Sequence, residues 1–484
     1  MVIVFALLAL AVLVAANWYL WRRLFRDTTH GPGRARRGGA VLIAGGWALA
    51  IGALVAERVG APFWLQRTLA WPGFLWLALS IYLLLGVLAA EAVRPLLHRF
   101  LESRARTAPP AETPTPHPDP TLAPSPTLAP GPSPSPHPDP VPTATPAQGQ
   151  PVAAQPKQPA PEQPAPEQPA PGQLAAGRPE FGQAESGRPE GGRAESGRPE
   201  GGRAESVGVV SSRRVFVSRV VGGAVAAAAV GTVGYGSYGV LRGPRVKRVT
   251  VPLAKLPRAA HGYRIAVVSD IHLGPILGRG FAQKVVDTIN ATRPDLIAVV
   301  GDLVDGSVKD LGPAAAPLAQ LRARHGSFFV TGNHEYFSGA EQWVREVRRL
   351  GLNPLENART ELPWFDLAGV NDIAGESEGR GPDFTRALGD RDTTRACVLL
   401  AHQPVQIHDA VDHGVDLQLS GHTHGGQLWP GNFIAAAANP TVAGLERYGD
   451  TQLYVSRGAG AWGPPTRVGA PSDITVIELA SKQA

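Results

Sequence analysis

The sequence has a single cysteine, Cys397, among its 484 residues. One cysteine excludes a disulfide bond within the chain and a zinc module built from several cysteines. Acidic and basic residues are missing from the centres of the apolar segments near the N-terminus. We therefore interpret these segments as membrane anchors rather than as a transport or sensing device, which would need ionisable side chains there. By contrast, the 47 prolines and 56 glycines are unevenly spread, which indicates a linker between folded parts.

The charge of the chain is moderately positive. It has 46 Lys and Arg against 40 Asp and Glu, a formal net charge of +6. An excess of basic residues can indicate nucleic-acid binding, but the basic residues here are mainly arginines, and many of them flank apolar segments. Membrane topology explains the charge more simply, so we predict no nucleic-acid partner.

The N-terminal region, residues 1–106, contains three apolar segments of a length that can cross a bilayer as helices. A cleaved signal peptide is the alternative for the first of them. It is disfavoured because no positive region precedes this segment, whereas arginines follow it. The loop after the first segment is rich in arginine and the next loop has only Arg58 and Arg67, so the positive-inside rule places the first loop in the cytoplasm. The segments are residues 2–21, 40–56 and 72–90.

Residues 107–206 change in composition to Pro, Ala, Gly, Glu and Ser. The ten-residue sequence Gly-Arg-Pro-Glu-Gly-Gly-Arg-Ala-Glu-Ser begins at position 187 and again at 197. Such a sequence buries too little apolar area to offset chain entropy, and we predict a disordered linker that is partly extended as polyproline II.

Residues 207–248 contain a fourth apolar segment, 220–241. It is preceded by Ser-Arg-Arg-Val-Phe-Val at 212–217, which is either an internal twin-arginine export signal or an ordinary basic flank. Either interpretation sends the following domain across the membrane, and we expect a multi-pass protein of the cell membrane with an extracytoplasmic domain. Four basic residues between Arg242 and Arg248 count against this orientation.

From residue 249 to 484, apolar runs of strand length alternate with helix-like segments and glycine turns, which predicts one α/β domain. Several of these runs end in polar residues. Because ligands gather beyond the carboxyl ends of strands in α/β sheets, we expect these endings to form one pocket. Each ending by itself is also ordinary turn chemistry. The endings are Asp270-Ile271-His272, Gly301-Asp302-Leu303-Val304-Asp305, Gly332-Asn333-His334-Glu335 and His402.

The stretch Leu419–Gln427 reads Leu-Ser-Gly-His-Thr-His-Gly-Gly-Gln and places His422 and His424 two residues apart after a strand-like segment. Neutral imidazoles are strong metal ligands, and imidazole with carboxylate favours Mn, Fe or Zn over calcium. Two such cations about 3.5 to 4 Å apart could hold a bridging hydroxide and neutralise charge on a phosphoryl group. The residue types therefore suit two divalent or trivalent metal ions.

Taken in order, these motifs resemble the calcineurin-like metallophosphoesterase family over roughly residues 249–479. Gly-Gly-Gln at 425–427 and the closing segments, such as Trp462-Gly463-Pro464-Pro465, resemble its membrane-associated, YkuE-like branch, which often carries a twin-arginine segment before the domain. The resemblance implies a two-sheet α/β sandwich, here preceded by transmembrane helices and a disordered Pro-rich linker.

The resemblance also implies a role for each motif residue. His334 would protonate the leaving oxygen or stabilise the transition state, Asp305 would orient His334, and Glu335 receives no role. Asp302 would bridge the two metals. One metal would be held by Asp270, His272, Asp302 and His424, and the other by Asp302, Asn333, His402 and His422.

The leading hypothesis is a membrane-anchored, metal-dependent phosphoric ester hydrolase, either a phosphodiesterase or a phosphomonoesterase, acting on a phosphoester or pyrophosphate bond. Its expected partners are the membrane and a phosphorylated small molecule or lipid; a cell-envelope substrate is an extension from proximity. A non-catalytic metal-binding scaffold is the alternative, and the complete ligand set argues against it. Trp429 and Trp462 are expected in core packing, with a lipid-facing cleft as the alternative.

Overall fold

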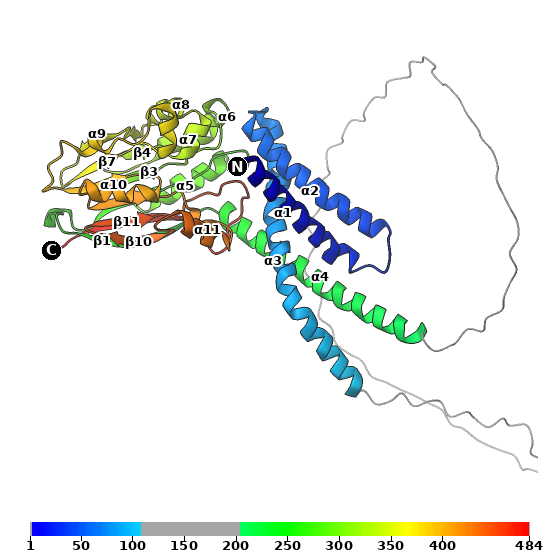
Figure 1. Cartoon of the computed structure of the whole chain (residues 1–484). Coiled ribbons are helices and arrows are strands. Elements are labelled where there is room, and N and C mark those ends of the chain that lie inside the picture. The colour runs from blue at the N-terminus through cyan, green and yellow to red at the C-terminus, as the bar shows by residue number, and fades with distance from the viewer. Residues whose placement is uncertain (1, 108–203, 484) are drawn as a thin grey trace, which may run out of the picture. The chain divides into compact units, whose positions relative to one another are not determined.

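The computed structural model describes residues 2–107 and 204–483, which are drawn in colour in Figure 1. The predicted Pro-rich linker lies almost entirely outside the described residues. The N-terminal helices and the C-terminal domain belong to one compact unit.

Long helices form the N-terminal part of this unit. The predicted first span is the helix α1, followed by a short π-helical segment, η1. Among the described residues, three stretches are helical, long and apolar enough to cross a membrane: 34–58, 63–93 and 214–241. They contain the other three predicted spans. The elements are α1 (Val2–Trp21), η1 (Arg22–Arg26), α2 (Arg34–Arg58), α3 (Phe63–Thr107) and α4 (Ala204–Leu241).

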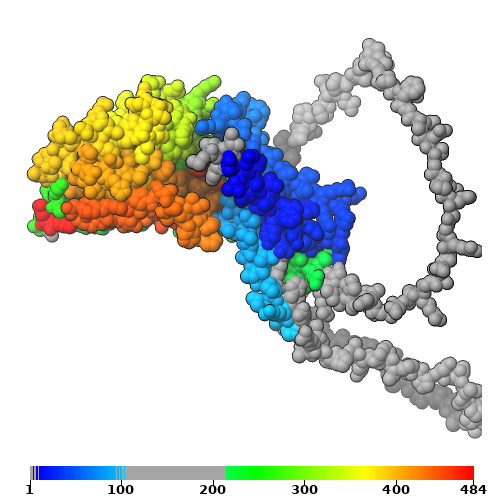
Figure 2. Space-filling view, viewed as in Figure 1, coloured from blue at the N-terminus to red at the C-terminus, as the bar shows by residue number. Residues whose placement is uncertain are grey.

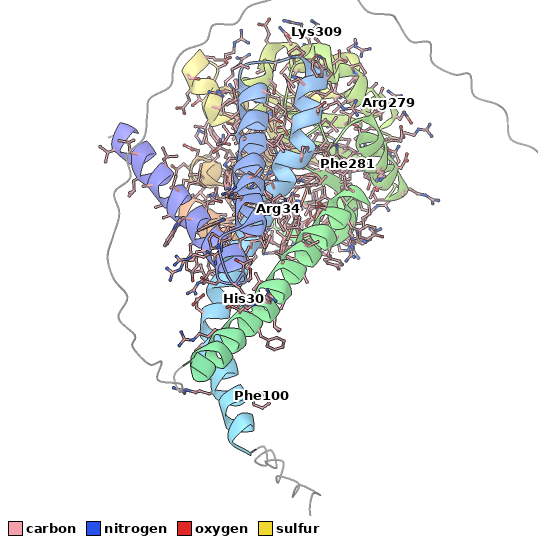
Figure 3. All side chains as sticks on the ribbon, turned by 90° about the vertical axis from the view of Figure 1, so that its right-hand side faces the viewer. His30, Arg34, Phe100, Arg279, Phe281 and Lys309 are labelled. Atoms are coloured by element: carbon pink, nitrogen blue, oxygen red, sulfur yellow. The ribbon has the colours of Figure 1, made fainter. Side chains whose placement is uncertain are left out.

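Side-chain contacts hold these helices together. Figure 3 shows α2 and α3 side by side, with His30 and Arg34 at the end where α2 begins. The indole N–H of Trp47 on α2 donates to Asn17 Oδ1 on α1 at 2.7 Å. Small residues bring the helices close: a Cβ at Gly86 of α3 would lie 2.8 Å from a methyl group of Val225 on α4.

The C-terminal domain consists of two six-stranded mixed sheets, with strand orders β1-β12-β2-β3-β4-β5 and β10-β11-β9-β8-β7-β6. This is the two-sheet α/β sandwich expected from the sequence. The first sheet is formed by β1 (Arg245–Leu253), β2 (Tyr263–Val268), β3 (Leu296–Val300), β4 (Ser327–Val330), β5 (Asn353–Pro354) and β12 (Asp473–Ser481). The second is formed by β6 (Ala358–Glu361), β7 (Phe365–Gly369), β8 (Ala396–Leu400), β9 (Leu417–Ser420), β10 (Gly444–Tyr448) and β11 (Thr451–Val455).

Helices follow many of the strands along the chain. They are α5 (Arg279–Ala291), α6 (Val308–Ala315), α7 (Asn333–Ser338), α8 (Ala340–Arg349), α9 (Phe384–Leu388), α10 (Ile407–Asp412) and α11 (Gly431–Ala438).

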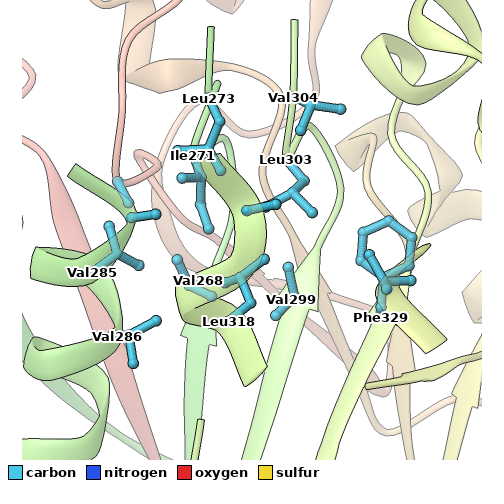
Figure 4. Packing of buried hydrophobic residues seen from close by; sticks show 14 of the residues in the cluster. Val268, Ile271, Leu273, Val285, Val286, Val299, Leu303, Val304, Leu318 and Phe329 are labelled. Atoms are coloured by element: carbon cyan, nitrogen blue, oxygen red, sulfur yellow. The ribbon is translucent and has the colours of Figure 1, made fainter. Parts of the chain in front are cut away.

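Apolar side chains fill both faces of the central strands, as expected for parallel strands covered on both sides. Every residue of β3 is buried. One cluster includes Val299 and Phe329 from the first sheet and Val285 from α5 (Figure 4). A second cluster lies between the two sheets and includes Ala298 and Val398. Alternate residues of β3 thus face different layers, which fixes the strand between the helices and the second sheet.

The sheet topology brings the predicted strand endings to one place. Strands β2, β3 and β4 are parallel neighbours in the first sheet. Strands β8 and β9 are parallel neighbours in the second. The predicted strand-like runs before each motif are confirmed, and their carboxyl ends carry the polar residues considered next.

Candidate metal centre

The backbone at the strand ends is unusual. The predicted ligands Asp270, His272, Asp302, His422 and His424 all have positive φ angles, between 49° and 68°. Side chains other than glycine rarely adopt this left-handed conformation, which costs about 1–3 kcal/mol where the surroundings impose it. Strain of this kind clusters at functional sites.

The first group of ligand atoms comes from the ends of β2 and β9. Asp270, His272 and His424 offer atoms that lie within 4.8 Å of one another, and all three residues are buried. The Nε2 atoms of His272 and His424 are 3.0 Å apart, and His424 Nε2 is 3.4 Å from Asp270 Oδ1. Two imidazole nitrogens and a carboxylate oxygen converging in this way are a suitable donor set for a transition metal.

The second group is built around Asp302, at the end of β3, with His402 and His422. The Nδ1–H of His402 donates to the Val300 carbonyl at 2.8 Å, which leaves the Nε2 lone pair free. This Nε2 lies 3.1 Å from Asp302 Oδ2, yet it is buried without a hydrogen-bond partner among the described residues. Burying an unpaired polar atom is costly, and a metal ion at this point would satisfy it.

Asn333 and His422 complete the second group. Asn333 Oδ1 and His422 Nδ1 lie 3.1 Å apart. Both groups thus contain facing electron-pair donors, and the residues present fit two metal ions. Asp302 reaches both groups, because its Oδ2 is also 3.8 Å from His272 Nε2.

Asp305 connects one predicted ligand with the predicted catalytic histidine. Its Oδ1 lies 2.8 Å from Nδ1 of His272 and 2.7 Å from Nδ1 of His334. Burial alone would raise the pKa of Asp305, but the charges and hydrogen bonds of these two histidines lower it to about 2. Burial alone would lower the pKa of His334, but its hydrogen bond to Asp305 and that charge raise it to about 9. The imidazole of His334 is therefore protonated on both nitrogens, and positively charged, at neutral pH.

Glu335 has a structural role that the sequence analysis missed. Its buried carboxylate accepts backbone N–H groups from Gly332, Asp302 and Leu303 at 2.7, 3.0 and 2.8 Å. It therefore ties the turn that carries Asp302 to the start of α7. A signal was available, because a Glu at the third helical position commonly reaches back to cap the helix start.

We expect Glu335→Ala to lower the free energy of unfolding by about 3 kcal/mol, because three buried backbone N–H groups lose their acceptor. At 2–4 °C per kcal/mol for a domain of this size, the melting temperature of the full chain in detergent should fall by roughly 10 °C. Glu341→Ala is the matched control, since Glu341 is exposed on α8. Equal melting temperatures for the two variants would contradict this role.

Arg467 was also missed. Its guanidinium is buried, with Nη2 3.0 Å from His424 Nδ1 and Nη1 donating to the His424 carbonyl at 3.0 Å. Arg467 follows His424 by 43 positions in the chain, so no local pattern could have linked them. Arg467 fixes the ring of a predicted metal ligand.

A cavity of about 530 Å³ opens beside the two ligand groups. His334, Phe337 and Trp462 line it. The ring centroid of His334 lies 5.5 Å from that of Phe337 and 5.7 Å from that of Trp462. Trp462 is 54% exposed and Trp429 is 50% exposed. The expectation of core packing is therefore wrong for both tryptophans, because neither side chain is enclosed by the apolar clusters.

Comparison with known proteins identifies the fold family. Residues 263–426 match the family described as calcineurin-like phosphoesterase. A metallophosphoesterase of Aquifex aeolicus is 35% identical over 243 residues, which cover 49% of this chain and 92% of that protein. The chain belongs to the calcineurin-like phosphoesterase family.

Two further relatives resemble this calcineurin-like phosphoesterase. The metallophosphoesterase YkuE of Bacillus subtilis is 30% identical over 284 residues, covering 56% of this chain and 98% of that protein. A transmembrane protein with metallophosphoesterase domain from Danio rerio is 39% identical over 264 residues, or 52% of this chain. The chain covers only 60% of the length of the zebrafish relative.

The region that matches the family contains all seven predicted metal ligands of this phosphoesterase. Other residues that line the cavity lie outside it. Leu54, Glu57 and Arg58 come from α2, and Trp462 comes from the segment before β12.

Proposed function

We propose that the chain is a membrane-anchored phosphoesterase that uses two metal ions to hydrolyse a phosphoester or pyrophosphate bond. The observation that carries this proposal is the meeting of two ligand groups at one carboxylate, Asp302, beside the protonated ring of His334. In this proposal one metal is held by Asp270, His272, Asp302 and His424, and the other by Asp302, Asn333, His402 and His422.

When bound, such ions supply positive charge that neutralises phosphoryl oxygens and lowers the pKa of the attacking water. The side chains of this phosphoesterase do the rest. Asp305 holds the Nδ1–H of His334, so that Nε2 remains available to the substrate. Because the pKa of His334 is raised to about 9, its imidazole holds at neutral pH the proton that the leaving oxygen needs.

Membrane anchoring rests on the helices. One end of the bundle is rich in arginine, and there Arg23 pairs with Glu91 at 2.7 Å. The opposite ends of α2 and α4 lie at the domain: Arg58 lines the cavity, and Leu241 packs against the domain core. With the arginine-rich end in the cytoplasm, the domain is extracytoplasmic and the chain is a multi-pass protein of the cell membrane.

A domain surface suited to lipid adjoins these helices. Tyr82 of α3 donates a hydrogen bond to the Trp429 carbonyl at 3.0 Å. Beyond Trp429, Phe433 and Ile434 of α11 are 65% and 77% exposed. Exposed apolar side chains grouped in this way favour contact with a membrane. This surface supports a lipid or cell-envelope substrate over a freely soluble one.

The test of the proposed function is metal-dependent hydrolysis. We expect the full chain, purified in detergent and stripped of metal with a chelator, to hydrolyse bis-p-nitrophenyl phosphate only after Mn²⁺ is restored. The control is the Asp302→Asn, His334→Ala double variant, treated in the same way. The proposal fails if the reloaded wild type is no faster than this variant. Measuring the metal content of the same preparations tests the non-catalytic alternative. A metal-binding scaffold would contain bound metal but would not hydrolyse the substrate.

A further inference from the structure

The cavity beside the candidate metal centre has a wall that does not belong to the phosphoesterase domain. Leu54, Glu57 and Arg58, at the C-terminal end of α2, line it together with Asn333 and His334. In the space-filling view, the light-blue segment around residue 60 lies against the yellow-green segment that contains α6 and α7 (Figure 2). Residues of α2, a candidate membrane-spanning helix, therefore form part of the wall of the cavity in which the proposed reaction occurs.

Arg58 has the properties of an anion-binding residue. Its guanidinium makes no hydrogen bond or ion pair within residues 2–107 and 204–483 as the structure describes them. Arg58 is the last residue of α2, where the helix dipole favours a cation. The helix dipole explains a basic residue at this point but does not explain why it lines the cavity. Guanidinium stays charged at all accessible pH values and offers paired donors that match the oxygens of phosphate. The position and chemistry of Arg58 together suit a phosphoryl oxygen of the substrate.

Beside the charged side chains of Glu57 and Arg58, the wall contains apolar side chains. Leu54 precedes Arg58 by one helical turn, about 6 Å along the axis, and is 45% exposed. Phe337 and Trp462, 64% and 54% exposed, flank the ring of His334. Free aromatic and aliphatic surface beside a charged centre suits a ligand that has both an anionic group and an apolar chain.

The place of this wall along α2 indicates where such a ligand comes from. The helix is free of charged residues from Gly38 to Ala56, and Glu57 and Arg58 mark the end of that stretch. Charged residues at the end of an apolar span lie at the level of lipid headgroups. A phosphate at this level has its apolar chain on the membrane side, where Leu54 lies.

We propose that the end of α2 is the membrane-side wall of the substrate pocket. Arg58 binds an anionic oxygen of a membrane-embedded amphiphilic phosphoester, whose apolar chain lies against Leu54, Phe337 and Trp462. This inference rests on the proposed phosphoesterase function and names the class of its substrate. In this proposal Arg58 and Leu54 act as substrate-binding residues and not as metal ligands.

The test compares two chromogenic diesters that differ in chain length, ethyl and dodecyl p-nitrophenyl phosphate, with the full Mn²⁺-loaded chain in detergent. We expect kcat/KM to be on the order of 10-fold higher for the dodecyl ester, because its chain is buried in the pocket. Leu54→Ser should remove most of this preference by lowering kcat/KM for the dodecyl ester. Val55→Ser is the matched control, since Val55 is similarly exposed but does not line the cavity.

Arg58→Gln should raise KM about 10-fold for both esters with little change in kcat, because a charge-assisted contact with the phosphoryl group is lost. Arg67→Gln, in an exposed position on α3 outside the cavity lining, should change neither constant. If the Leu54 and Arg58 variants behave like their controls while the wild type hydrolyses both esters, this inference is overturned and the phosphoesterase function stands. If the wild type hydrolyses neither ester, the proposed function itself fails.

Discussion

Asp302→Asn is expected to reduce hydrolysis by at least about 1,000-fold and to lower the metal content at both sites. The carboxylate is shared by the two ligand groups, at 3.1 Å from His402 Nε2 and 3.8 Å from His272 Nε2. In the proposed centre, its replacement removes a negative charge that both metal ions would share. A rate loss of about 1,000-fold corresponds to roughly 4 kcal/mol of lost transition-state stabilisation, since each 1.36 kcal/mol changes the rate tenfold.

The fold should survive this substitution. Asn keeps the oxygen that accepts the His334 backbone N–H at 2.9 Å, and Glu335 still accepts the backbone N–H of residue 302. The melting temperature of the metal-free variant should therefore match that of the metal-free wild type. Metal content by mass spectrometry and kcat with bis-p-nitrophenyl phosphate are the readouts, with exposed Asp287→Asn as the control. Two tightly bound ions and normal turnover in Asp302→Asn would exclude a bridging role.

His334→Ala is expected to reduce kcat by about 100-fold to 10,000-fold for a poor leaving group while both metals stay bound. The ring is held by Asp305 at 2.7 Å and does not belong to either of the two proposed metal sites. In the proposed mechanism, its contribution is the proton that it delivers to the leaving oxygen. A p-nitrophenolate leaving group needs little protonation, so the same substitution should cost far less with a p-nitrophenyl ester than with an alkyl ester.

The dependence on the leaving group separates this role from a structural one. Metal content should remain at the wild-type value, whereas loss of a ligand would lower it. Asp305→Asn is the companion variant, and because Asp305 also contacts His272 it should affect both metal binding and kcat. If His334→Ala slows the alkyl and p-nitrophenyl esters equally, proton donation by His334 is refuted.

The sequence predicted the elements of the site well because each motif directly follows a buried strand. Apolar runs such as residues 296–300 can be recognised as buried strands from the local sequence alone. When several such runs end in polar residues in a particular order, those residues indicate a shared site. The two-sheet fold and the family are confirmed. The division of His422 and His424 between two groups came from the resemblance. In the structure, His424 lies with Asp270 and His272, whereas His422 lies with Asp302 and His402.

Other parts of the site depend on residues that are distant in the chain. Arg467 reaches His424 across 43 positions, and Trp462 lies beside His334 across more than one hundred. Hydrophobic periodicity describes neighbours within a helix or strand and says nothing about which loops meet. The predicted burial of Trp429 and Trp462 was wrong for the same reason. It relied on the general preference of tryptophan for the core and not on which segments pack around each ring.

The sequence by itself determined the chemistry: carboxylates, imidazoles and an amide at the ends of strands, and apolar segments able to cross a membrane. Only the tertiary structure decided what surrounds that chemistry. It buried Glu335 against three backbone N–H groups, and it brought Arg58 from α2 into the same cavity as His334. The physical reason is that ligand type is a property of each residue, whereas a pocket wall is formed by packing between segments whose separation in the chain carries no local signal.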